Sequence, residues 1–246
     1  MRKVNRETLR TRFQRSLSLW SRSRVPLELP LTGGLIAIVD ALWFKTKHHR
    51  PTYGCFSILL RPVDSKEAYL ITLTLLRGKE SKAYWRQVFE DLPQDVRNRV
   101  VAIVADGFTG LLSLALEYGW YFQWCQVHML RRMLELRGFR NLPGKDIRKR
   151  VLRLMREFME TPSRQKAASC QLALARIFSD PECPRSIVTR LSGLIKRGYL
   201  LRTCFDVPEL NLPMSTNSVE RVNAFIRERF SICAWRKFRK ISGALD

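Results

Sequence analysis

The chain has 246 residues, with 44 Lys and Arg against 22 Asp and Glu, so its formal net charge is +22. Its 46% of hydrophobic residues can form a core and exclude a disordered chain, while no uncharged apolar run reaches the roughly 18 residues of a membrane-spanning helix. A balance this basic favours a polyanionic partner, with nucleic acid ahead of an anionic membrane surface.

The first predicted element is a basic amphipathic helix at residues 5–20. Leu9, Phe13 and Leu17 recur there at helical spacing. A signal peptide would have an apolar segment directly after its basic N-terminus, and this sequence has none there. Two prolines then end the helical pattern and predict a linker up to about residue 30.

From Gly34 onward the sequence alternates between apolar runs and helical patterns. Three consecutive runs rich in β-branched and aromatic residues predict strands at 34–44, 55–63 and 68–78. Two further predicted strands, each preceded by a predicted helix, are at 99–107 and 121–127. The order β-β-β-α-β-α-β, with three antiparallel strands and then two α/β units, is that of an RNase H-like α/β core with a mixed sheet and flanking helices.

Beyond His128 the pattern becomes helical as far as about Tyr199, and a last helix is predicted within residues 214–230. We interpret the helical stretch as an all-α insertion that interrupts the core. The first predicted domain, residues 1–30, is a basic helix and linker that we interpret as a remnant of an N-terminal DNA-binding domain. It is followed by the first part of the core at 31–128, the helical insertion at 129–205 and the last part of the core at 206–246.

Three carboxylates stand out by their context. Asp40 lies inside an apolar strand, where an unpaired charge is costly, although a hydrogen bond within the core would also account for it. Asp106 ends the fourth predicted strand, where open α/β sheets bind ligands, but it also fits a simple Asp-Gly turn. Glu220 opens the last helix, where Asn217-x-x-Glu220 also fits a capping box. Together the three could hold two Mg²⁺ ions, which favour oxygen ligands and promote in-line phosphoryl transfer.

The excess positive charge is concentrated in three segments. Residues 1–24, 131–166 and 221–240 carry +7, +8 and +6, whereas residues 25–130 carry eleven basic against ten acidic side chains. Three basic segments around a nearly neutral core indicate several contacts with a DNA or RNA backbone. The candidate DNA-binding residues are Arg6, Arg10, Arg12, Arg15, Arg131, Arg132, Arg148, Lys149, Arg150, Arg227 and Arg229.

In this order, the segments VDALWF, VADGFTGL, WCQVHMLRR and STNSVERVNAFIRERF resemble the DDE transposases of bacterial insertion sequences. The similarity is to the Mutator-like superfamily and covers about residues 34–230. It implies that Asp40, Asp106 and Glu220 are the catalytic triad. It also implies that they bind two Mg²⁺ ions, with Mn²⁺ able to substitute.

The resemblance gives a role to four other residues. Cys125 and His128 match the family's C-x-x-H signature, and Asn217 belongs to its T-N-x-x-E pattern, with Arg221 directly after the metal carboxylate. A structural zinc site needs four protein ligands, and no second Cys/His pair with suitable spacing is present. A structural or substrate-organising role of Cys125 and His128 is therefore favoured over zinc binding.

The implied function is cleavage of double-stranded DNA at the ends of an insertion sequence and transfer of the freed 3′-OH to target DNA. The resemblance also implies a homodimer or higher oligomer in the synaptic complex. The unpaired cysteine spacings favour a cytoplasmic protein, which would act at the nucleoid. The alternatives are another RNase H-like nuclease or resolvase, a truncated remnant that binds DNA without an assembled triad, and a membrane-surface protein.

Overall fold

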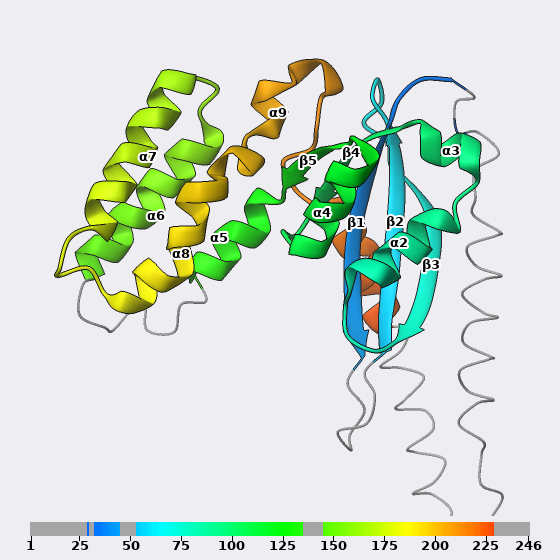
Figure 1. Cartoon of the computed structure of the whole chain (residues 1–246), viewed down its shortest axis with the longest axis horizontal. Coiled ribbons are helices and arrows are strands. Elements are labelled where there is room, and N and C mark those ends of the chain that lie inside the picture. Colours follow the sequence, from blue (N-terminus) through cyan, green and yellow to red (C-terminus); the bar gives the residue numbers. More distant parts are fainter. Residues whose placement is uncertain (1–28, 30–31, 45–52, 135–144, 229–246) are drawn as a thin grey trace, which may run out of the picture. The chain divides into compact units, whose positions relative to one another are not determined.

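The fold comes from a computed structural model that describes residues 29, 32–44, 53–134 and 145–228 (Figure 1). The helix and linker predicted before residue 29 lie outside these residues. The chain divides into two compact units. The first unit joins the chain up to Val100 with the chain from Thr216 onward, and the second comprises Val101–Ser215.

Five strands form a mixed sheet, in the order β3-β2-β1-β4-β5. Strands β1 and β2 pair antiparallel, as do β2 and β3, whereas β4 and β5 pair parallel. The predicted order of elements up to the fifth strand is confirmed, except that a short second helix, α3 (Gln94–Asn98), precedes the fourth strand. The strands are β1 (Leu35–Phe44), β2 (Tyr53–Pro62), β3 (Tyr69–Arg77), β4 (Val100–Ala105) and β5 (Tyr121–Trp124).

One face of the first three strands is covered by α2 (Lys82–Glu90), which lies in front of them in Figure 1. Ser81 caps this helix by accepting a hydrogen bond from the Tyr84 N–H at 3.2 Å. The rings of Trp85 and Phe56 pack edge to face with centroids 4.9 Å apart. A second short helix, α3 (Gln94–Asn98), then leads into β4.

The opposite face of the same strands is covered by a helix at residues 217–228, drawn in orange behind the sheet in Figure 1. Because side chains alternate along a strand, Leu42 and Cys55 point away from the face that carries Phe56. They form an apolar cluster with Ile226 of this helix. The cluster is completed by Leu70, Leu73, Leu75 and Val222.

The second unit starts with β4, α4 (Thr109–Tyr118) and β5. Gly119 ends α4 in the left-handed conformation, with φ of 70°, as predicted for a C-cap glycine. The strand predicted at 121–127 is shorter than expected, because β5 ends at Trp124 and α5 (Gln126–Leu134) begins two residues later. The apolar run through Val127 continues as the buried side of a helix, since Gln126 and Met129 are buried there.

Four helices of this unit share one hydrophobic cluster. Helix α5 is followed by α6 (Lys145–Glu160), α7 (Arg164–Phe178) and α8 (Arg185–Arg197), which lie within the stretch predicted to be helical from its periodicity. The cluster includes Met129, Met155 and Leu174. No described helix is both long enough and apolar enough to cross a membrane.

Buried polar side chains connect these helices to the segment that follows them. That segment contains η1 (Gly198–Leu201), α9 (Thr203–Asp206) and η2 (Pro208–Leu210). The Gln126 amide donates to the carbonyls of Met159 at 3.1 Å and Leu201 at 2.9 Å. The Arg202 guanidinium donates hydrogen bonds to the carbonyls of Phe158 and Thr161. It thereby provides donors for carbonyl groups that have no partner within α6 at its C-terminal end.

The five described cysteines are all buried thiols: Cys55, Cys125, Cys170, Cys183 and Cys204. Burial raises the pKa of Cys55 to about 12 and that of Cys204 to about 11. Both side chains are therefore neutral thiols at neutral pH and poor nucleophiles. They pack as small apolar residues in the two units.

Candidate active site

Asp40 lies in the middle of β1 and is half-buried. Its Oδ1 accepts a hydrogen bond from the Ala41 N–H at 2.9 Å. Its Oδ2 accepts a shorter bond, of 2.7 Å, from the Asn223 side-chain amide. These bonds offset part of the cost of holding a carboxylate in an otherwise apolar strand.

Asn223 comes from the 217–228 helix and was not among the residues predicted from the sequence. It is 3% exposed, and its Oδ1 accepts a hydrogen bond from the Ser57 hydroxyl at 3.0 Å. Its position three residues after Glu220 places both side chains on neighbouring parts of the helix surface. That spacing was the available signal in the sequence, but the partner on β1 could be identified only from the fold.

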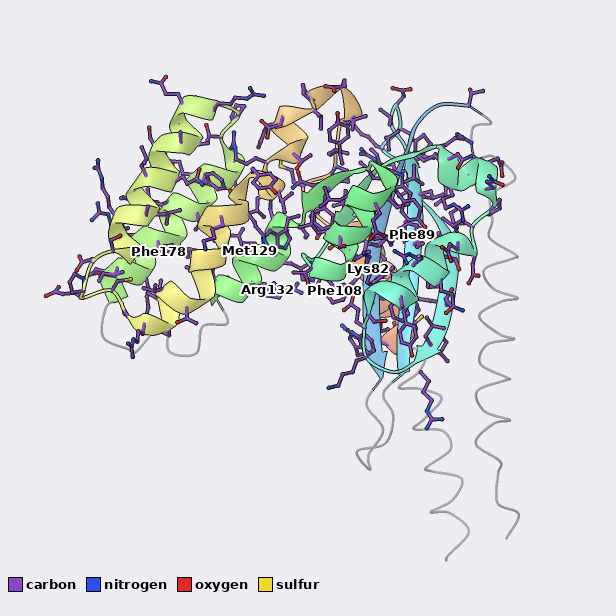
Figure 2. All side chains as sticks on the ribbon, in the orientation of Figure 1. Lys82, Phe89, Phe108, Met129, Arg132 and Phe178 are labelled. Atoms are coloured by element: carbon purple, nitrogen blue, oxygen red, sulfur yellow. The ribbon has the colours of Figure 1, made fainter. Side chains whose placement is uncertain are left out.

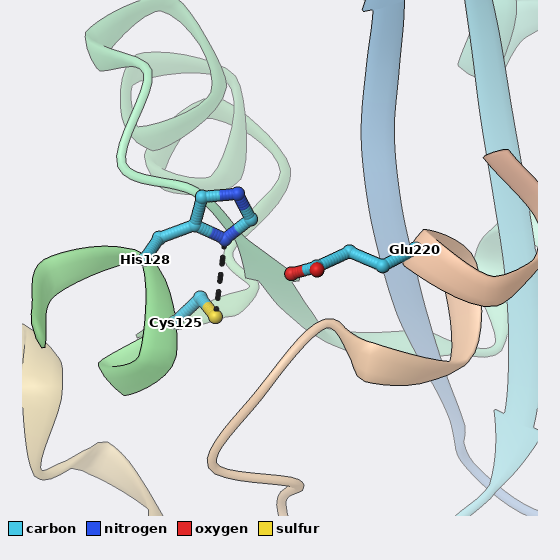
Figure 3. Close-up of side chains that lie close together, drawn as sticks. All are labelled: Cys125, His128 and Glu220. Carbon is cyan, nitrogen blue, oxygen red and sulfur yellow. Dashed lines mark hydrogen bonds between the residues drawn. The ribbon is translucent and has the colours of Figure 1, made fainter. Parts of the chain in front are cut away.

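Glu220 is half-buried and lies in the first turn of the same helix (Figure 3). The helix begins at Asn217, so Thr216 rather than Asn217 takes the cap position expected from the capping-box interpretation. The Thr216 hydroxyl donates to Glu220 Oε1 at 3.2 Å, and the Glu220 N–H donates to the Thr216 carbonyl at 3.0 Å. Asn217 and Arg221 are exposed on this helix.

In the second unit, Asp106 directly follows β4, at the predicted end of that strand. Its Oδ1 accepts a hydrogen bond from the Phe108 N–H at 3.1 Å, which closes a tight turn. Its Oδ2 lies 3.6 Å from Nη2 of Arg132, a residue of α5 that Figure 2 labels. Both side chains are partly exposed, so the ion pair is screened by solvent.

The turn after Asp106 is fixed by a close approach between Gly107 and Trp124. The Trp124 indole N–H donates to the Asp106 carbonyl at 2.8 Å. Gly107 has φ of +92°, and a Cβ added there would lie 1.7 Å from Trp124 Nε1. Only glycine fits this position, because both the backbone conformation and the indole exclude a side chain.

Cys125 and His128 lie at the start of α5, immediately after β5. The Cys125 N–H donates to the Ala105 carbonyl at 2.7 Å, which fixes the chain next to the residue that precedes Asp106. His128 Nδ1 lies 3.3 Å from Cys125 Sγ, the hydrogen bond drawn in Figure 3. The two side chains of the signature thus contact each other one turn apart on the helix.

Most of the basic residues predicted to bind DNA are exposed where the structure describes them: Arg131, Arg132, Lys149, Arg150 and Arg227. Arg148 differs, because only 3% of it is exposed. It precedes Val151 and Met155 by three and seven residues, so it lies on the buried face of α6, where a phosphate cannot reach it. The other candidates, Arg6, Arg10, Arg12, Arg15 and Arg229, lie outside the described residues.

Exposed basic side chains also surround a pocket of about 750 Å³ along α6 and the start of α7. Lys166 is paired there with Glu157 at 2.8 Å. The charged residues that line the pocket are four basic and two acidic, and this excess of positive charge suits an anion. They are Lys149, Arg153, Arg156, Glu157, Glu160 and Lys166.

Strand-associated carboxylates in a mixed α/β fold, together with exposed basic helices, are features of a DNA-processing protein. Residues 66–235 match the family described as Transposase, Mutator family, and the chain therefore belongs to the Mutator family of transposases. The match covers more than half of the chain and includes Asp106 and Glu220, whereas Asp40 precedes it. No curated protein matches the chain.

Proposed function

We propose that this transposase cleaves DNA at the ends of an insertion sequence and joins the freed 3′-OH to target DNA, on an RNase H-like core. Membership in the Mutator family supports DNA cutting and transposition. The observation that carries the proposal is the position of Asp40 on β1, where Asn223 bonds it to the helix that bears Glu220. A carboxylate held in this way is suited to a fixed role in chemistry.

The three proposed catalytic side chains have the ligand chemistry that divalent cations require. Asp40, Asp106 and Glu220 would supply carboxylate oxygens, the ligands that Mg²⁺ prefers, and Mn²⁺ could replace Mg²⁺ at such ligands. Bound there, the metal ions would activate the attacking oxygen and stabilise the leaving oxygen of an in-line displacement. Neighbouring residues would hold each carboxylate in place. Thr216 donates a hydrogen bond to Glu220, Asn223 donates one to Asp40, and the turn at Gly107 fixes the backbone next to Asp106.

The exposed basic residues would bind the DNA backbone. Arg132 and Lys149 lie on two different helices of the second unit, and Arg227 lies on the 217–228 helix. Their guanidinium and ammonium groups suit phosphate oxygens, which fix the register of a protein on DNA without reading its sequence. We further propose that the protein acts as a homodimer or higher oligomer, because two ends must be brought together.

The direct test uses plasmid DNA that carries the sequences flanking this gene, incubated with the protein and a second target plasmid. We expect nicks with 3′-OH ends and joined products in Mg²⁺ or Mn²⁺, and neither product in EDTA. Nicking without joining would instead indicate a nuclease or resolvase. DNA binding without any metal-dependent nicking would indicate a remnant with an unassembled triad.

We expect the DNA affinity to fall steeply with salt, because every neutralised phosphate releases counterions. With six or more phosphate contacts, the affinity should drop about 10³-fold between 50 and 200 mM salt, measured by fluorescence anisotropy. Replacing exposed Lys149 and Arg150 together by Gln should make the slope of log K against log salt shallower by about 2. Exposed Gln87 replaced by Ala is the control, and a nearly flat plot for the wild type would contradict the backbone-contact model.

A further inference from the structure

We propose that Asn223 is a positioning residue that sets the orientation of the Asp40 carboxylate for metal binding. The inference rests on the proposed function, since it assumes that Asp40 is a metal ligand. The Asn223 amide bridges two strands: it donates to Asp40 Oδ2 on β1 and accepts from the Ser57 hydroxyl on β2. It thereby links the strand that carries the first carboxylate to the helix that carries Glu220.

The chemistry of the three groups fixes the direction of both hydrogen bonds. An ionised carboxylate only accepts, so the Asn223 NH₂ group must face Asp40, and the amide oxygen is left to accept from the Ser57 hydroxyl. A flipped amide would place two acceptors against each other at 2.7 Å. Asn223 therefore has one stable orientation, which the Asp40 carboxylate selects, and the Ser57 hydroxyl adapts by donating to the amide oxygen.

The register of the sheet places the two partners of Asn223 side by side. Asp40 and Ser57 are directly opposite each other in the antiparallel pair of β1 and β2, so their side chains point to the same face. The 217–228 helix packs on this face through Val222 and Ile226. Asn223 directly follows the first of these apolar contacts and precedes the second by three residues, so its backbone is held against the strands.

The hydrogen bonds from Asn223 and from the Ala41 N–H each engage one oxygen of the Asp40 carboxylate. One bond on each oxygen fixes the plane of the carboxylate, and with it the directions along which its oxygens could bind a metal ion. Ligating carboxylates commonly depend on such outer partners, and loss of one typically costs 10- to 100-fold in metal affinity or activity.

The experiment measures Mn²⁺ binding by electron paramagnetic resonance. The site of interest is the one whose Mn²⁺ signal is lost in the Asp40→Asn variant. DNA nicking is measured in parallel on the same proteins. We expect Asn223→Ala to weaken Mn²⁺ binding at that site at least about 10-fold, with a matching rise in the Mn²⁺ concentration for half-maximal nicking. Ser57→Ala should have a smaller effect in the same direction. The double variant should behave like Asn223→Ala alone, because Ser57 acts through Asn223.

Val219→Ala is the matched control for lost stability, since it removes buried methyl groups from the same helix but no side-chain hydrogen-bonding group. It should lower the midpoint of urea unfolding but leave Mn²⁺ affinity within two-fold of the wild type. If Asn223→Ala also stays within two-fold while Asp40→Asn removes the site, the positioning role is wrong and the proposed function stands. If the wild type binds no Mn²⁺ that depends on Asp40, both are wrong.

Discussion

Replacing Asp106 by Asn is expected to reduce metal-dependent DNA nicking by about 10³-fold or more. Loss of a metal-binding carboxylate removes several kcal/mol of transition-state stabilisation, and each 1.4 kcal/mol is a factor of ten in rate. The fold should persist, because an Asn side-chain oxygen can still accept from the Phe108 N–H and the Trp124 bond uses the backbone carbonyl. The measurement is initial nicking rate in Mg²⁺, with the unfolding midpoint recorded for the same preparation.

The same chemical change at an exposed carboxylate provides the control. Asp64 lies in the turn between β2 and β3 and is exposed, so Asp64→Asn should leave both nicking and stability unchanged. The ion pair between Asp106 and Arg132 is also lost in Asp106→Asn, which Arg132→Gln tests separately. Equal nicking by the wild type and Asp106→Asn would refute the catalytic assignment.

The second large effect is expected from Gly107→Ala, which should destabilise the second unit by about 2–5 kcal/mol. The estimate adds overpacking against the Trp124 indole, typically 1–3 kcal/mol, to the cost of about 1–2 kcal/mol for a side chain at positive φ. Because the turn fixes Asp106, nicking should fall as well. Urea unfolding followed by far-ultraviolet circular dichroism measures the loss.

Gly119→Ala separates the two contributions to this effect. Gly119 also has positive φ, of 70°, but a Cβ there would meet nothing within 4 Å. Its replacement should therefore cost only the backbone strain, about 1–2 kcal/mol. In a Trp124→Ala background, Gly107→Ala should lower the stability by less than it does in the wild type, because the indole is absent. An equal loss in both backgrounds would mean that the indole does not determine the overpacking cost.

Local patterns in the sequence account for most of the secondary structure. Apolar runs rich in β-branched and aromatic residues identified β1 to β3, and helical periodicity identified the helical stretch that contains α6 to α8. The cap at Ser81 and the stop at Gly119 are equally local, because each depends on neighbouring backbone groups. These features are set within a few residues, so the sequence alone suffices.

The contacts that hold the candidate site could not be predicted in the same way. Asn223 and Asp40 are 183 residues apart, and Gln126 reaches carbonyls 33 and 75 residues away. A buried amide and an exposed amide look alike in a sequence, since neither composition nor periodicity records which distant group it meets. Arg148 was wrongly predicted for a similar reason. Its basic neighbours suggested a phosphate contact, but its position on α6 places it on the buried face of that helix.

The 217–228 helix has a consequence for how the protein is made. It covers a face of β1 to β3 that is synthesised long before it, and Asn223 follows Ser57 by 166 residues. At roughly 5–20 residues per second, a ribosome needs about 8–33 s to span that interval. Throughout this time the nascent sheet presents Leu42, Cys55 and Leu73 without their cover, a surface that chaperones bind and proteases detect. A chain interrupted before residue 217 would therefore keep this apolar face of the sheet exposed.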